Sequence, residues 1–136
     1  MPTTVTSTFE VTGWDETVYD EPAEGSKLSR ITVTKRFTGP LDATSTAQLL
    51  TAVAPDDPNQ AGYIGSERVT GTLDGRSGTF VIQHGGIAGG PEPRHPRQFG
   101  WVVPGSGTGD LHSLTGSVLF QHDEHGAIFT MDYDLP

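Results

Sequence analysis

The sequence contains no cysteine, which excludes disulfides, thiol nucleophiles and cysteine-held metal sites. No apolar run approaches the ~20 residues that a membrane-spanning helix needs. The first residues, Met1–Thr4, also lack the basic start and apolar centre of a signal peptide. We therefore expect a cytoplasmic protein.

Basic residues are scarce. Eight Lys and Arg residues stand against 17 Asp and Glu residues, so the formal net charge is −9. Such a surface repels the phosphates of nucleic acids and the head groups of anionic lipids. We therefore expect neither nucleic acid nor membrane as a partner.

Apolar residues make up only 33% of the 136 residues, whereas 18 are Gly and 10 are Pro. This composition is too apolar for a disordered chain, and it indicates many turns around a modest core. The length fits one domain over residues 1–136.

Most of the chain alternates between apolar and polar residues with the period of two that is typical of β-strands. The predicted strands are Thr3–Val11, Leu28–Phe37, Ala61–Leu73, Thr79–His84, Phe99–Val103, Leu114–Gln121 and Ile128–Leu135. Leu41–Val53 fits a short helix or a strand, and its threonines favour the strand. The pattern predicts an all-β protein.

Two features of these strands favour a single closed antiparallel barrel of about eight strands. Glycines lie inside strands, at Gly65, Gly71 and Gly116, where a closing sheet must bend sharply. Closure also removes exposed strand edges. A two-sheet sandwich is the alternative.

Turn-forming residues separate the predicted strands. The acidic stretch Trp14–Ser26 reads as a solvated loop, and Asp74-Gly75 as the tip of a hairpin. Gly85–Pro96 reads as a long loop rich in glycine and proline, and such loops are often functional.

Glycines alternate with small residues in Val102–Gly116. We expect a bend here at which the sheet curls, and a connection that binds no ligand is the alternative. A phosphate-binding loop is disfavoured because no Lys follows Gly109 and the residues downstream are β-rich rather than helical.

The segment Gly105–Gly116 resembles the Gly-Thr-Gly signature of allene-oxide-cyclase-like and dirigent-like barrels. A longer pattern is similar to that of a bacterial family of unknown function, which is grouped with allene oxide cyclase by its barrel. The segments that carry this resemblance are Tyr63–Glu67, Gly71–Phe80, Gln83–Gly86 and Val103–Gly109, together with Phe9, Trp14, Lys35–Gly39, His125 and Tyr133.

This resemblance implies an eight-stranded, allene-oxide-cyclase-like barrel with a cavity on its axis. Relatives in the wider group cyclise or orient small hydrophobic molecules without a cofactor, and several are trimers. We therefore expect a small hydrophobic ligand, no cofactor, and a homodimer or homotrimer. The resemblance transfers no substrate and no catalytic residue to this chain.

Polar residues on inward faces are the candidates for chemistry, because a buried charge must be paired or neutral. Glu67 shares its face with Tyr63 and Val69, and Lys35 shares its face with Val33. The two charges form either a structural ion pair or a site in which desolvated Glu67 is a general acid or base.

Histidine and tyrosine supply the other candidates. His84 lies at a predicted strand end, where it either transfers protons or caps the strand. Tyr63 and Tyr133 either point hydroxyls into the cavity or pack as core aromatics. Glu67, Tyr63 and His84 are the predicted catalytic residues. The predicted ligand-binding residues are Lys35, Phe80, Ile82, Trp101, Phe129, Met131 and Tyr133.

His122 and His125 flank two acidic residues in an H-D-E-H segment. The segment falls on a predicted tight turn, where the side chains diverge, so we expect no metal site.

Three functions remain open from the sequence. The first is a cofactor-free cyclase or isomerase that acts on a small apolar substrate, such as a secondary metabolite, in the barrel lumen. The second is a non-catalytic carrier or sensor of a hydrophobic ligand. The third is a structural protein whose own side chains fill the lumen.

Overall fold

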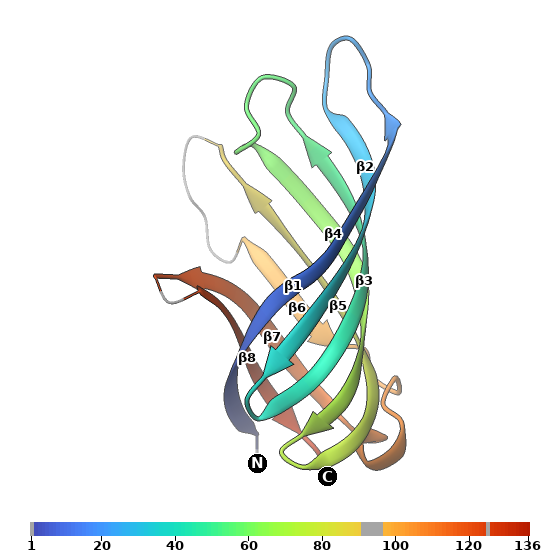
Figure 1. Cartoon of the computed structure of the whole chain (residues 1–136), viewed down its shortest axis with the longest axis vertical. Coiled ribbons are helices and arrows are strands. Elements are labelled where there is room, and N and C mark those ends of the chain that lie inside the picture. The colour runs from blue at the N-terminus through green and yellow to red at the C-terminus, as the bar shows by residue number, and fades with distance from the viewer. Residues whose placement is uncertain (1, 91–96, 125) are drawn as a thin grey trace.

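The computed structural model describes residues 2–90, 97–124 and 126–136 (Figure 1). In these residues eight strands are hydrogen-bonded in a closed antiparallel ring in the order β1 to β8. The strands are β1 (Thr3–Asp20), β2 (Lys27–Thr38), β3 (Leu41–Val53), β4 (Ala61–Leu73), β5 (Arg76–Ala88), β6 (Gln98–Val102), β7 (Thr115–Asp123) and β8 (Gly126–Asp134). The predicted closed barrel is confirmed, and the sandwich alternative is wrong.

The ring has two unlike ends. The chain termini and the β2–β3 and β4–β5 turns lie at one end, which we call the closed end (Figure 1). The β1–β2 and β3–β4 connections lie at the other, which we call the open end. Figure 1 also shows that the β7–β8 hairpin is shorter than its neighbours and leans away from them there.

Strand β1 is longer than the alternation predicted, so the predicted loop at Trp14–Ser26 is wrong over most of its length. Two register shifts, at Val11/Gly13 and Val18/Asp20, let β1 follow β2 as far as Asp20. The pairing continues because β2 offers a regular partner there, for example Val33 opposite Trp14. Backbone hydrogen bonds to a long partner thus override an acidic, turn-like composition.

Strand β5 also outruns its prediction. It continues through His84 to Ala88, pairing with β4 as far as Ala61 and with β6 as far as Gln98. The predicted loop therefore begins after Ala88, and residues 91–96 of it lie outside the described residues. The ambiguous Leu41–Val53 segment is strand β3, as the threonines favoured.

The glycine-rich segment forms the connection between β6 and β7 rather than a bend within the sheet. It contains a single turn of 3-10 helix, η1 (Gly109–Leu111), and it folds under the closed end. Leu111 and Leu114 insert their side chains into the core there and are buried. The segment therefore seals the barrel, and Gly107 lets it fold tightly, since a methyl group there would lie 1.8 Å from the carbonyl oxygen of Leu111.

Close approach of the backbone explains one of the strand glycines. A methyl group at Gly78 would lie 2.1 Å from the carbonyl oxygen of Thr108, so only glycine fits beside the connection. The Thr108 hydroxyl accepts a hydrogen bond from Thr79 N–H at 3.0 Å, and Ser106 Oγ accepts one from Val81 N–H at 3.0 Å. These bonds continue the edge of β5 where β6 has ended.

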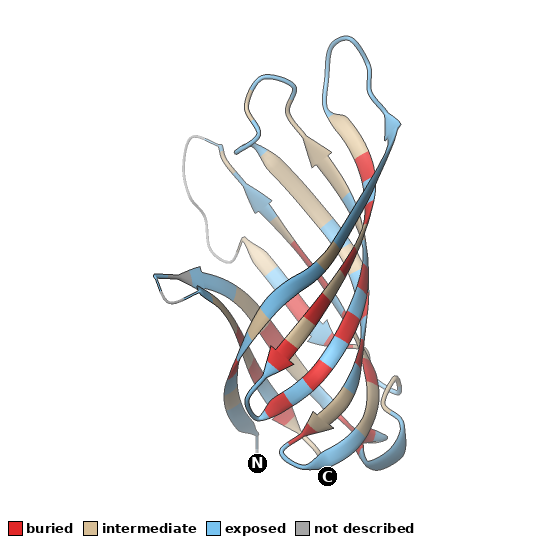
Figure 2. Ribbon diagram, in the orientation of Figure 1, coloured by how far each residue is buried: buried red, intermediate tan, exposed pale blue. Residues whose placement is uncertain are grey.

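Large buried side chains gather toward the closed end (Figure 2). The main hydrophobic cluster comprises Phe37, Leu41, Ala43, Val69, Leu73, Phe80, Ile82, Val102, Leu111, Leu114, Val118, Phe129, Met131 and Tyr133. Toward the open end most strand residues are half-buried or exposed in Figure 2, although Ser29 and Ile31 of β2 remain buried. In the described part of the chain, no helix is long and apolar enough to cross a membrane.

Candidate functional site

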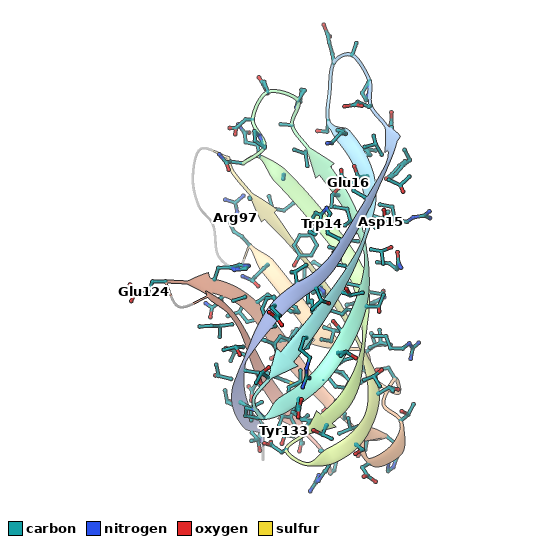
Figure 3. The ribbon with its side chains drawn as sticks, viewed as in Figure 1. Trp14, Asp15, Glu16, Arg97, Glu124 and Tyr133 are labelled. Atoms are coloured by element: carbon teal, nitrogen blue, oxygen red, sulfur yellow. The ribbon has the colours of Figure 1, made fainter. Side chains whose placement is uncertain are left out.

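A cavity of about 1080 Å³ occupies the open end of the ring. Its wall includes Trp14 from β1, Leu49 from β3, Tyr63 from β4 and Phe120 from β7. Figure 3 shows Trp14 on β1 and Arg97 beside β6 at a similar level of the molecule, far from Tyr133 at the closed end. This volume is slightly above the range of about 300–1,000 Å³ that is usual for small-molecule sites.

The cavity exists because the inward positions near the open end carry small side chains. Thr51, Ala61, Gly86 and Ala88 line it from β3, β4 and β5. The same strands place leucine and phenylalanine at inward positions of the closed end, among them Leu73. Side-chain volume along each strand thus decides which half of the tube is filled.

Glu67 lies beneath the floor of the cavity with an exposed fraction of 0%. Its Oε1 accepts a hydrogen bond from Lys35 Nζ at 3.0 Å, and its Oε2 accepts one from Ser45 Oγ at 2.6 Å. The predicted interior ion pair between Glu67 and Lys35 is confirmed. A carboxylate this deeply buried needs several donors, because burial strips it of water.

His84 connects Glu67 to the cavity. Its Nε2 lies 2.8 Å from Glu67 Oε1, and its Nδ1 lies 3.0 Å from the Tyr63 hydroxyl. Ionised Glu67 can only accept a hydrogen bond, so Nε2 carries a hydrogen. With neutral imidazole, Nδ1 is then the acceptor and the Tyr63 hydroxyl donates to it. Tyr63, His84 and Glu67 form a hydrogen-bonded chain from the cavity into the protein interior.

The surroundings shift the pKa values of Glu67 and Tyr63, the two acids of this hydrogen-bonded chain, in opposite directions. Burial by itself raises the pKa of Glu67, but the His84 hydrogen bond, the Lys35 charge and the Ser45 hydroxyl outweigh it, and the pKa is lowered. Burial, and then the negative charge of Glu67, raise the pKa of Tyr63. Glu67 therefore stays ionised, and Tyr63 keeps its proton at neutral pH.

Aromatic rings cover the cationic side of the network. Lys35 Nζ lies 4.2 Å from the ring centroid of Phe120 and 5.3 Å from that of Phe9. Phe120 also packs on the His84 ring, with centroids 4.6 Å apart. Since Phe120 lines the cavity, its ring separates the cavity from the buried charges.

Of the predicted site residues, only Tyr63 lines the cavity. His84, Glu67 and Lys35 lie behind it as the network described above. Four further residues were expected to contact a ligand in the lumen but are buried in the hydrophobic cluster instead: Phe80, Ile82, Phe129 and Met131. Their placement on inward faces was right, but the tube is solid at their level.

Tyr133 and Trp101 also lie away from the cavity. The Tyr133 hydroxyl donates a hydrogen bond to the Asp74 carboxylate at the closed end. Trp101 is 61% exposed, because Gly100 and Val102 take the inward positions of β6 and leave Trp101 on the outer face. The prediction that Trp101 faces the lumen is wrong, since the apolar run around it hid the alternation.

Several cavity residues were missed by the sequence analysis, among them Trp14, Leu49, Gln98 and Phe120. Trp14 was missed because its segment read as a loop. The period of two does assign Leu49 and Phe120 to inward faces, so this signal was present. It does not show how far along the tube each residue lies.

The first two residues of the H-D-E-H segment end strand β7, which runs to Asp123, and Glu124 begins the turn that follows. His122 lines the cavity and packs against Phe9, with ring centroids 6.0 Å apart, whereas His125 lies outside the described residues. Among the residues that the structure does describe, no group of three or more His, Asp or Glu side chains is arranged to hold a metal ion.

Comparison with known proteins gives a family but no activity. The sequence profile of the family described as "Protein of unknown function (DUF3224)" matches residues 5–135. A crystal structure of a DUF3224 protein of unknown function from Shewanella oneidensis MR-1 is similar, with a TM-score of 0.86 and 31% identity over 100% of this chain and 99% of that chain. No curated protein matches the sequence. The chain thus belongs to the DUF3224 family.

Proposed function

We propose that this protein binds a small, largely apolar molecule in the open-end cavity and isomerises or cyclises it by proton transfer, without a cofactor. The observation that carries the proposal is the Tyr63–His84–Glu67 chain, which brings an ionised, fully buried carboxylate into contact with the cavity through two hydrogen bonds. The resemblance to allene-oxide-cyclase-like and dirigent-like barrels supports the same reading.

The hydrogen-bonded chain of Tyr63, His84 and Glu67 allows two arrangements of protons. In the first, Tyr63 donates to neutral His84, and the phenol oxygen is left to accept a proton from a ligand. In the second, His84 is an imidazolium that donates to Tyr63, and the phenol hydrogen points to the ligand. Ionised Glu67 stabilises the imidazolium of the second arrangement.

One proton taken from the ligand converts the first arrangement into the second, and its return to another atom of the ligand restores the first. The reaction is therefore balanced as an isomerisation. Tyr63 is the catalytic residue, and His84 and Glu67 act through it. Confinement of the ligand in one conformation would supply much of the remaining rate.

The binding half of this proposal is tested with N-phenylnaphthylamine, a neutral probe that fluoresces in apolar surroundings. We expect saturable binding at one site per chain. Ala61→Trp fills the cavity and should abolish binding, whereas the matched Ala23→Trp in the exposed β1–β2 connection should not change it. Equal binding by the two variants would place the probe elsewhere and refute the site.

The catalytic half is tested by turnover of candidate polyenes, epoxides and unsaturated ketones in D2O, followed by mass spectrometry. Tyr63→Phe removes the transferring hydroxyl, and a general acid or base typically contributes about 10²–10⁴-fold. A protein that binds such compounds and releases them unchanged, with no deuterium incorporated, is a carrier or sensor instead.

A further inference from the structure

Gln98, the first residue of β6, carries an amide that the protein uses only in part. Its Oε1 accepts a hydrogen bond from Phe120 N–H at 3.3 Å, and because N–H requires an acceptor, this bond determines which way the amide is turned. Within the part of the chain that the structure describes, Gln98 Nε2 has no partner. Gln98 lines the cavity, so two N–H donors are left for whatever occupies it.

Gly86 creates a niche between this amide and Tyr63. The three residues form one row across β4, β5 and β6, with Tyr63 opposite Gly86 and Gly86 opposite Gln98. A methyl group at Gly86 would lie 3.4 Å from Tyr63 Cε1 and 3.5 Å from Gln98 Cβ. The missing side chain thus leaves room for a ligand group that touches both neighbours.

We propose that this niche binds a carbonyl group, and that the substrate is an enolisable ketone, aldehyde or ester with an apolar body. This inference rests on the proposed function and names its substrate class. Gln98 Nε2 donates to the carbonyl oxygen, while the Tyr63 oxygen, as acceptor, faces the carbon next to the carbonyl. Tyr63, Gly86 and Gln98 together then recognise the carbonyl group.

The chemistry of the niche suits this assignment. When the C–H bond next to the carbonyl breaks, its proton goes to the Tyr63 oxygen as the Tyr63 hydrogen moves to His84 Nδ1. The electron pair forms a carbon–carbon double bond, and the carbonyl π pair moves onto the oxygen, where the Gln98 donors stabilise the charge. Return of the proton to the same or a conjugated carbon completes the isomerisation.

A neutral carbonyl fits the niche better than an anion does. The amide of Gln98 is an uncharged donor, and the positive charge of Lys35 is already paired with Glu67 at 3.0 Å. Arg97 also lines the cavity, but it meets the niche with its backbone carbonyl oxygen, 3.6 Å from a methyl group at Gly86, and a carbonyl oxygen repels an anion. A carboxylate in the niche would instead be separated from the Glu67 carboxylate only by Tyr63 and His84.

The test compares two neutral probes of similar body. Prodan is a naphthalene that bears an enolisable propionyl ketone, and N-phenylnaphthylamine has no carbonyl. We expect Gln98→Leu to weaken prodan binding by about tenfold, the equivalent of one hydrogen bond, and to leave N-phenylnaphthylamine within about twofold. The matched Gln83→Leu, on the outer face of β5, should change neither.

Gly86→Ala provides a second variant that is expected to fold, because its methyl group makes only ordinary contacts. It should weaken prodan in the same selective way by occupying the niche. Wild-type protein should also accelerate exchange of the prodan protons next to the carbonyl in D2O, and Gln98→Leu and Tyr63→Phe should both slow this exchange.

The outcomes separate the two proposals. If both probes bind in the cavity but Gln98→Leu and Gly86→Ala affect them equally, the carbonyl niche is wrong and the proposed function stands. If neither probe binds, the proposed function is wrong and this inference is wrong with it.

Discussion

The closed and open ends of the barrel are built from the same strands with the same alternation, yet one is solid and the other is hollow. Phe80 and Leu73 face inward toward the closed end, where they are fully buried. Gly86 and Ala88 continue the inward face of β5 toward the open end, where they line the cavity. The alternation determines only the direction in which a side chain points, and the volume of that side chain determines whether the tube is filled or hollow.

Ring closure differs between the two ends in a corresponding way. Near the closed end, β1 pairs with β8 from Thr3 to Phe9. Beyond Phe9 the described residues of β1 pair with β2 alone, and the described ladder between β6 and β7 consists of the single pair Trp101–Ser117. The hollow end is therefore also the less tightly closed end.

The charged network lies at the boundary between these ends, and removing one of its charges should have the largest effect on stability. Glu67→Gln leaves the Lys35 charge buried without its counter-ion, so we expect a loss of about 3–5 kcal/mol in the free energy of unfolding. Urea unfolding followed by far-UV circular dichroism measures this loss. The double variant Lys35→Met/Glu67→Gln removes both charges and should recover most of it.

The difference in stability between wild type and Glu67→Gln should also depend on pH. Because the pKa of Glu67 is lowered in the folded state, its contribution is complete above the ordinary carboxyl pKa of 4.5 and is lost as the pH falls through the folded value. The difference between wild type and Glu67→Gln should therefore shrink on acidification. A single variant as stable as wild type at neutral pH would show that the ion pair is not important for stability.

A matched pair of leucines compares the packing of the two ends directly. Leu73 is fully buried at the closed end, and Leu49 lines the cavity. Leu73→Ala opens a void among packed neighbours and should cost about 3 kcal/mol, whereas Leu49→Ala only enlarges an existing cavity and should cost about 1 kcal/mol or less. Equal losses in urea unfolding would mean that the open end is packed as tightly as the closed end.

The sequence predicted the ring, and it predicted the buried pair of charges within it. Lys35 and Glu67 could be paired in advance because each interrupts an otherwise apolar inward face, and a buried charge requires a partner. The Asp74-Gly75 hairpin was also predictable, since both residues adopt the left-handed conformation there, with φ of 49° and 83°.

The cavity could not be located in the same way, because its position depends on how far neighbouring strands are displaced along one another. Leu73 and Leu49 both lie on inward faces of neighbouring strands, yet Leu73 fills the core and Leu49 borders the cavity. Register assigns each residue to a level of the barrel, and alternation alone carries no information about register between strands. Trp14 was missed for another reason. Its part of β1 is a strand because it pairs with β2, although its composition is typical of a loop.

A small effect should also come from Tyr133, the closed-end counterpart of Tyr63. Each phenol donates one hydrogen bond, Tyr133 to the Asp74 carboxylate and Tyr63 to His84, but only Tyr63 borders the cavity. Tyr133→Phe should therefore cost about 1 kcal/mol of stability and leave probe binding and turnover unchanged. Tyr63→Phe, by contrast, should not leave them unchanged.

Alkaline unfolding isolates the Tyr133 contribution. Burial, together with the hydrogen bond to Asp74, raises the pKa of Tyr133 to about 12, above its ordinary value of 10.0. Between these values the unfolded chain loses the phenol proton while the folded chain keeps it, so wild-type stability falls as the pH rises. Tyr133→Phe lacks this component, and its deficit relative to wild type should narrow above pH 10. A constant deficit across that range would mean that Asp74 does not hold the phenol in its neutral form.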